Sequence, residues 1–144
     1  PLSPDLTGDP GAAVSAFRGL DLSRRLDRAG DDHLMNLITG TITAVSVSPV
    51  DNRILWAGTD GGNVWVSADA GATWTRVNPP GPARWVTDIA CDPFEARAAW
   101  MTVTGYRLGD RVPYVRVTTD LGSTWLDLGR TLPQVPINSV AADP

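Results

Sequence analysis

An eight-residue pattern occurs twice in this chain and constrains its fold more than any other feature. The pattern is S/T-x-D-x-G-x-T-W, and it occupies residues 67–74 and residues 118–125. A pattern that returns after about 50 residues is typical of proteins that stack one supersecondary unit against the next. The chain is therefore expected to contain at least two copies of one structural repeat.

The sequence around the two copies repeats as well. Similar short segments end at Pro49, Pro93 and Pro144. Trp56 follows Pro49 by seven residues, and Trp100 follows Pro93 by the same distance. The second repeat is longer, and its extra residues fall in one loop, around residues 104–112. All other positions stay in register, so the repeat extends well beyond the eight-residue pattern.

Each repeat is interpreted as four short β-strands. Runs rich in β-branched and aromatic residues alternate with Gly, Pro, Asn and Asp turns, which predicts antiparallel strands rather than helices. The predicted strands are residues 43–48, 53–57, 63–68 and 73–77 in the first repeat, and residues 86–91, 97–103, 114–118 and 124–128 in the second. Four such strands in about 45 residues match one blade of a β-propeller. The expected fold class is all-β: a β-propeller fragment of four-stranded antiparallel blades.

This interpretation divides the chain into five parts. Residues 1–7 are expected to end a preceding blade, and residues 8–40 to form an insertion between blades. Residues 41–80 and residues 81–133 each form a blade, and residues 134–144 form the first strand of a following blade. Neighbouring blades of the same parent chain are the expected partners, because an isolated pair of blades exposes apolar faces and sheet edges.

The residue types of the repeated pattern suit a tight hairpin between the third and fourth strands. The glycine supplies a backbone position with positive φ, and the aspartate accepts hydrogen bonds from backbone amides of its own turn. The hydroxyls tie the two strands together, and the tryptophan packs between neighbouring sheets. Both aspartates are therefore interpreted as structural rather than as a catalytic carboxylate pair. The structural set is Ser67, Asp69, Gly71, Thr73 and Trp74, with Thr118, Asp120, Gly122, Thr124 and Trp125.

The pattern resembles the Asp-box, or BNR repeat, of sialidases, sortilin-type receptors, xyloglucan-active endoglucanases and photosystem-assembly propellers. The flanking words at residues 56–65, 84–87 and 132–138 are similar to those of secreted bacterial proteins described as sortilin-like or glycosyl-hydrolase-like. The resemblance implies a propeller in a larger, secreted or cell-envelope protein, with the repeated turns away from the ligand-binding face. The chain departs from the usual pattern at Thr118, where Ser is commoner, and at Ala70 and Leu121, where Gly is usual.

Composition argues against several classes of function. The net charge is -4 and the chain has no lysine, which disfavours nucleic acid as a partner. No apolar run is long enough to cross a bilayer, so no membrane insertion is expected. A single cysteine and a single histidine, Cys91 and His33, offer no metal or cofactor site, and none is predicted. Asp27, Asp31 and Asp32 do not follow the spacing of a known calcium loop.

The predicted ligand-binding residues lie on loops that a propeller gathers on one face. These are the loops between second and third strands and the connections from one blade to the next. Aromatic side chains beside Arg and Asp suit the recognition of a protein or a glycan, through stacking and charge-assisted hydrogen bonds. The simpler interpretation is that the loops are only turns. The candidates are Asp60, Asn63, Arg84, Trp85, Tyr106 and Arg107, with Asp110 and Arg111 in the same loop as the last two.

Two functions are compatible with these features. The first is a non-catalytic scaffold or binding module that presents loops to a protein or glycan, a class that includes peptide receptors of the sortilin type. The second is part of a glycoside hydrolase whose catalytic carboxylates lie mostly outside this segment. Tyr106 and Arg107 would suit a sialidase-like site, but Glu95, the only glutamate in the chain, lies on a turn at the opposite edge. That deficit favours the binding module.

Overall fold

The computed structural model describes residues 41–143. The predictions for residues 1–7 and 8–40, for His33 and the nearby aspartates, and for Pro144 lie outside the described residues.

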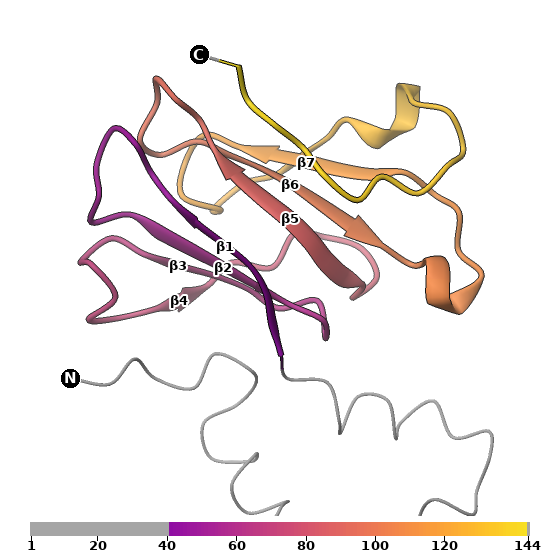
Figure 1. Cartoon of the computed structure of the whole chain (residues 1–144), viewed down its shortest axis with the longest axis horizontal. Coiled ribbons are helices and arrows are strands. Elements are labelled where there is room, and N and C mark those ends of the chain that lie inside the picture. The colour runs from indigo at the N-terminus through magenta and orange to yellow at the C-terminus, as the bar shows by residue number, and fades with distance from the viewer. Residues whose placement is uncertain (1–40, 144) are drawn as a thin grey trace, which may run out of the picture.

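The described chain folds into two four-stranded antiparallel sheets (Figure 1). The first sheet has the order β1-β2-β3-β4 and the second the order β5-β6-β7-β8, so each strand pairs with the next one along the chain. The strands are β1 (Ile42–Val47), β2 (Leu55–Thr59), β3 (Val64–Ser67), β4 (Thr75–Arg76), β5 (Trp85–Cys91), β6 (Ala99–Thr104), β7 (Tyr114–Thr118) and β8 (Leu126–Asp127). Two short 3-10 turns, η2 (Tyr106–Leu108) and η3 (Gly129–Thr131), follow β6 and β8.

This architecture confirms the predicted all-β fold class of four-stranded antiparallel blades. All eight predicted strands are present, and the one around residues 114–118 has the predicted bounds. The outermost strands, β4 and β8, are only two residues long, shorter than predicted. Each is an edge strand that pairs with one neighbour only. The pairing is limited to the two residues that directly follow the repeated turn.

The core lies between the two sheets, where β5 of the second sheet packs against β1 and β2 of the first. Trp56, Val64, Val86 and Met101 are fully buried there. The close approach requires Gly58 on β2, because a Cβ at that position would lie 2.3 Å from Cγ1 of Val86. The second repeat has a threonine at the equivalent position, so the glycine is specific to this contact.

Trp125, the last residue of the second repeated turn, joins the two sheets. Its indole N–H donates a hydrogen bond to the carbonyl of Val77 on the first sheet, at 2.9 Å. Its ring meets the buried ring of Trp56 edge to face, with 6.0 Å between centroids and 75° between planes. The sequence predicted an inter-sheet role for this tryptophan, and these contacts confirm it. Trp56 is fully buried, whereas its equivalent in the second repeat, Trp100, is only half-buried.

The antiparallel order sorts the connections to opposite ends of the sheets. One end, called here the turn edge, carries the two repeated turns at residues 68–74 and 119–125. The other, called the loop edge, carries residues 60–63, 78–85 and 105–113. The predicted ligand-binding residues therefore lie at the end opposite the repeated turns.

Residues 134–143 form no strand in the described chain. The segment lies against β5 instead, where the Asp88 carboxylate accepts hydrogen bonds from the Ser139 hydroxyl, at 2.7 Å, and the Val140 N–H, at 3.1 Å. A strand is defined by pairing with another strand, and no described strand pairs with this segment. The first strand of a following blade stays a prediction.

Apolar side chains of β1 are exposed where their repeat equivalents on β5 are buried. Ile42 and Val45 are 43% and 64% exposed, whereas Val86 and Ile89 are 0% and 4% exposed. The difference arises because β5 has the first sheet beside it. Within residues 41–143, no helix is long and apolar enough to span a membrane.

Replacing Trp125 with Phe is expected to lower the free energy of unfolding by about 1–2 kcal/mol, because the Val77 carbonyl loses its partner across the sheets. Trp74→Phe is the matched control, since the Trp74 indole N–H has no hydrogen-bond partner among the described residues. Its effect is expected to be smaller. Urea unfolding measures both, and equal losses would show that the hydrogen bond contributes nothing.

Candidate functional site

The two repeated turns are held by the same side-chain hydrogen bonds. Asp69 accepts bonds from the backbone N–H of Thr73 at 2.8 Å, from the Thr73 hydroxyl at 2.6 Å and from the Ser67 hydroxyl at 2.8 Å. Asp120 accepts the equivalent three bonds at 2.8, 2.7 and 2.8 Å. Each carboxylate is occupied by its own turn, which leaves it poorly placed to exchange protons with a ligand.

The backbone of these turns is left-handed at two successive positions. Gly71 and Gly122 have φ of 87° and 81°, as the turn chemistry predicts. Ala70 and Leu121, directly before them, also have positive φ, at 59° and 58°. Both stand where the resemblance leads one to expect glycine, so each turn contains a residue whose Cβ is strained by the backbone.

The hydrogen bonds of the turn lower the pKa of both aspartates. The Thr73 hydroxyl is the main cause for Asp69, whose pKa falls from 3.8 to about 2. The Thr124 hydroxyl is the main cause of the lowered pKa of Asp120. The pKa of every described aspartate that shifts is lowered, and these residues are Asp51, Asp69, Asp92, Asp110 and Asp120.

At the loop edge, Asp110 holds two parts of the chain together. Its Oδ2 accepts a hydrogen bond from Arg84 Nε at 3.1 Å and another from the Tyr114 hydroxyl at 2.8 Å, while Oδ1 accepts one from the Val112 N–H at 3.0 Å. The Val112 N–H is the main cause of its lowered pKa. Gly105 makes the network possible, because a Cβ there would lie 2.8 Å from Asp110 Oδ2 and 2.9 Å from Arg84 Nε.

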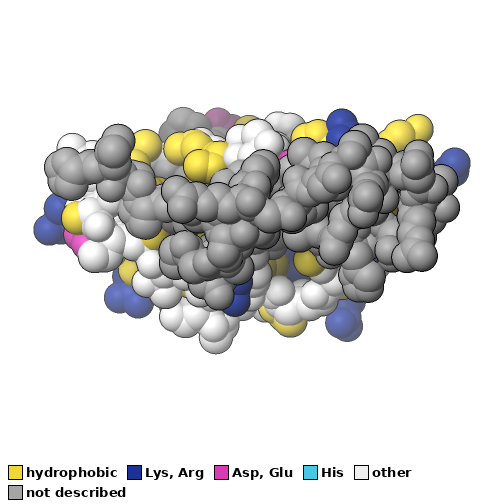
Figure 2. Space-filling view, turned by 90° about the horizontal axis from the view of Figure 1, so that it is seen from below, with side chains coloured by type: hydrophobic (Ala, Val, Ile, Leu, Met, Phe, Trp, Pro, Cys, Tyr) yellow, Lys and Arg dark blue, Asp and Glu magenta, His cyan; other side chains and the backbone are white. Residues whose placement is uncertain are grey.

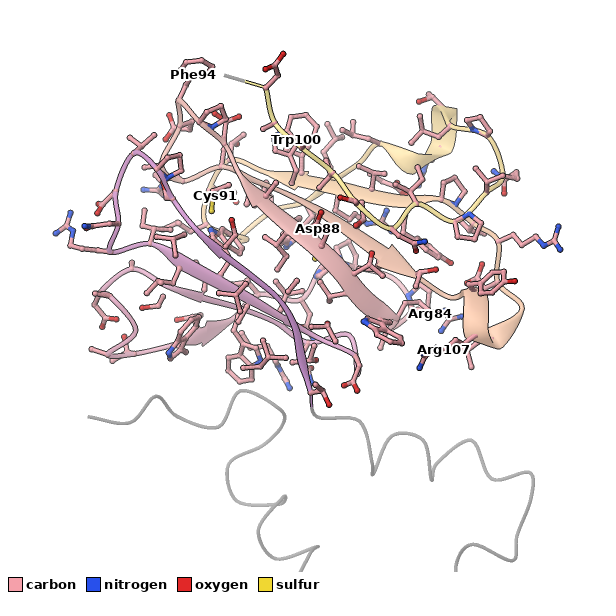
Figure 3. The ribbon with its side chains drawn as sticks, viewed as in Figure 1. Arg84, Asp88, Cys91, Phe94, Trp100 and Arg107 are labelled. Carbon is pink, nitrogen blue, oxygen red and sulfur yellow. The ribbon has the colours of Figure 1, made fainter. Side chains whose placement is uncertain are left out.

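Arg107 covers the face of Trp85. The guanidinium carbon of Arg107, on η2, lies 4.0 Å from the centre of the Trp85 ring, at the start of β5. This is the geometry of a cation–π contact, in which the planar guanidinium keeps N–H groups directed outward. Figure 3 shows Arg84 and Arg107 near the same end of the molecule, with Phe94 at the opposite end.

Asp60 and Asn63 have local roles at the same edge. Asp60 Oδ1 accepts a hydrogen bond from the Thr41 N–H at 3.1 Å, and the Asn63 side chain accepts one from Asn78 at 3.2 Å. Gly62 lies between them with φ of 84°, and a Cβ there would lie 2.7 Å from the backbone N of Arg84. The loop at residues 60–63 therefore packs directly against the connection that carries Arg84.

The structure places three of the six predicted ligand-binding residues, Arg84, Trp85 and Arg107, in two contacts at the loop edge, with Asp110 as the fourth partner. Arg84 is bound to Asp110, and Trp85 lies beneath Arg107. Tyr106 is 66% exposed on η2 and takes no part in either contact. Within residues 41–143, no group of three or more His, Cys, Asp or Glu side chains could hold a metal ion.

Arginines outnumber carboxylates at this edge. Arg111 is exposed and forms no ion pair with the described residues, and Arg107 forms none besides its contact with Trp85. Figure 2 views the molecule from below, and every dark blue side chain in it is an arginine because the chain has no lysine. The residues at or just inside the edge are Arg84, Arg107, Arg111, Arg116 and Arg130, against Asp60, Asp110 and Asp127.

Sequence reasoning missed Tyr114 and Arg116. Both lie on β7 and face the first sheet, since they pair with the buried Val103 and Met101 of β6. The alternation of Tyr114-Val-Arg-Val-Thr118 places them on one face and was available in the sequence. The signal was an arginine at the position that Trp65 fills in the first repeat, a charge where the repeat has an aromatic ring.

No protein-family model matches the sequence, and a search of curated proteins finds no match. Solved structures are similar at low identity. The GH74 xyloglucanase from Xanthomonas campestris is 19% identical, with a TM-score of 0.49 over 68% of this chain and 16% of the enzyme. YCF48 bound to D1 peptide is 19% identical, with a TM-score of 0.46 over 60% of this chain and 25% of that protein. YCF48 from Cyanidioschyzon merolae is 20% identical, with a TM-score of 0.45 over 64% of this chain and 25% of that protein.

The chain thus spans a quarter or less of each of these proteins. A likeness of this degree concerns the fold alone and assigns no role to any residue.

Asp69 predicts an acid-sensitive contribution to stability. Its folded pKa of about 2 lies below the unfolded value of 3.8, so the unfolded chain takes up the proton first as the pH falls. The stabilisation is complete above about pH 4 and is lost between about pH 4 and pH 2. We expect the melting temperature of Asp69→Asn to fall less over this interval than that of the unaltered chain. Parallel curves would contradict the assignment.

The two strained turn positions give a second test. Ala70→Gly is expected to raise the free energy of unfolding by up to about 1 kcal/mol, because glycine relieves the left-handed backbone and Ala70 is exposed. Leu121→Gly relieves the same strain but removes a side chain that packs against the core. It is expected to be destabilising by about 1–2 kcal/mol. Chemical denaturation decides, and a loss in Ala70→Gly would refute the strain.

Proposed function

We propose that this two-blade segment is a non-catalytic binding module and that its loop edge binds a protein partner through acidic side chains. The carrying observation is the pair Arg107 and Arg111, which lie exposed in one loop and form no ion pair with the described residues. Guanidinium groups bind carboxylates in a planar, two-bond geometry. Arginine is also among the residues that most often dominate binding energy at protein interfaces.

A glycan partner is less favoured by the same geometry. Sugar rings bind by stacking on an open aromatic face, whereas the face of Trp85 already carries the Arg107 guanidinium at 4.0 Å. Tyr106 is the exposed aromatic residue of this loop and could stack only from η2. Charge recognition through arginine is therefore the stronger proposal for this edge.

Glycoside hydrolysis is the second function that the sequence left open. A glycosidase needs a carboxylic acid with a raised pKa as the proton donor, beside a second carboxylate. At the loop edge, Asp110 is held ionised by the Val112 N–H, Tyr114 and Arg84, and its pKa is lowered. The described residues thus favour binding, and an enzymatic role would require carboxylates from elsewhere in a parent protein. Secretion or a cell-envelope location stays a prediction from the resemblance.

The proposal is tested by reversing charge at the loop edge. Arg107→Glu with Arg111→Glu is expected to weaken binding to an array of immobilised acidic peptides by about tenfold or more. Arg76→Glu with Arg97→Glu is the matched control, because these arginines are also exposed but lie away from the loop edge. Equal binding by the two double variants would contradict the proposal. If the Arg107→Glu, Arg111→Glu variant lost binding to neutral oligosaccharides, and the unaltered chain bound no acidic peptide, a glycan partner would be favoured instead.

A further inference from the structure

A small depression lies between the two sheets at the loop edge, beneath the proline-rich connection of residues 78–83. Its volume is about 80 Å³. Val64 of the first sheet and Val103 and Tyr114 of the second form its walls. The guanidinium groups of Arg84 and Arg116 also line it.

Arg116 is the unusual member of this lining. It is only 7% exposed, although it lies on the inner face of β7 between the sheets. Its Nη1 forms an ion pair with Asp127 Oδ1 at 2.7 Å, its one charged partner among the described residues. A guanidinium has five N–H donors, and this ion pair engages only one of its three nitrogens.

The surroundings offer few acceptors to this cation. The first sheet contributes no carboxylate to the depression, whose lining on that side is Gly62, Val64, Asn78 and the connection. Asp127 is shared, because its Oδ1 also accepts the Gly129 N–H at 2.9 Å and its Oδ2 lies 3.8 Å from Arg130. The other arginine of the lining, Arg84, already has Asp110 as its partner.

We propose that this depression is a subsite for a carboxylate group of a bound partner, held by Arg116. A carboxylate supplies two acceptor oxygens in the plane that a guanidinium needs. The volume has room for such a group and the carbons next to it, since one water needs about 10–15 Å³ by the same kind of measure. The apolar walls match the methylene carbons of an acidic side chain.

The connection over the depression leaves this space open. Gly81 has φ of 116°, and a Cβ added there would lie 3.7 Å from Arg116 Nη2. A side chain at this position would therefore narrow the entrance directly over the guanidinium. Residues 80–83 are themselves exposed, so the entrance faces solvent.

This inference deepens the proposed function, on which it rests for the partner, by naming the ligand group and the residue that holds it. The probe is the α-methylamide of N-acetyl-L-glutamate, whose one carboxylate is that of the side chain, titrated into the whole chain while the Nε–H resonances of the arginines are followed by NMR. The α-methylamide of N-acetyl-L-glutamine, its neutral isostere, is the control ligand. We expect the Arg116 resonance to shift and saturate with the glutamate compound only.

Two variants and one control variant sharpen the result. Asp127→Asn removes the resident carboxylate and is expected to tighten binding of the probe by about tenfold, because the guanidinium then lacks a competing anion. Arg116→Lys keeps the charge but loses the planar fork, and is expected to weaken binding by at least about fivefold. Arg97→Lys, at an exposed position away from the loop edge, is expected to leave it unchanged.

The outcomes separate this inference from the proposed function. An Arg116 resonance that fails to shift, or that shifts equally with both compounds, overturns the subsite and assigns the free donors to water. Shifts at Arg107 and Trp85 without one at Arg116 also overturn it but leave the loop edge as the binding surface. Saturation at Arg116, with no peptide bound by the loop edge, supports the subsite and overturns the proposed function.

Discussion

The contact between the two sheets through Trp125 is the interaction on which the rest of the structure depends. The side chain ends one repeated turn, yet its hydrogen bond and its ring contact are both made with the other sheet, at Val77 and Trp56. Gly58 lets β5 approach closely enough for those contacts to form. The packing of the two sheets also sets the relative position of the loops at the loop edge. Arg84 is the last residue of the connection from the first sheet, directly before β5.

Structural and chemical roles are separated along the strands. At the turn edge, carboxylates and hydroxyls satisfy one another within each hairpin, and their pKa values fall accordingly. At the loop edge, charged groups pair between different loops, and some arginines are left over. The same residue types therefore stabilise one end and are available for recognition at the other.

Sequence reasoning reached the fold because the strongest signals were local. The glycines and aspartates of the repeated turns dictate a hairpin wherever they occur, and the alternating segments around them form strands. The contacts at the loop edge were predicted only in outline. The sequence placed Arg84 and Asp110 on one face, but their contact depends on the missing side chain of Gly105, and the importance of that glycine appears only when the loop is folded. Arg116 was overlooked because it stands out only through its burial between the sheets, and the alternating pattern of a strand does not show how deeply a side chain is buried.

The network around Asp110 also bears on the cost of the binding proposed for this edge. A long loop between strands would ordinarily sample many shapes, and a partner would have to select one of them. Here one carboxylate, that of Asp110, ties the loop to the connection before β5 through Arg84 and to β7 through Tyr114. The arginines that the loop displays are thus carried on a preformed frame. The conformational entropy of this loop is therefore lost during folding, and the entropy still to be lost on binding is mainly that of the partner.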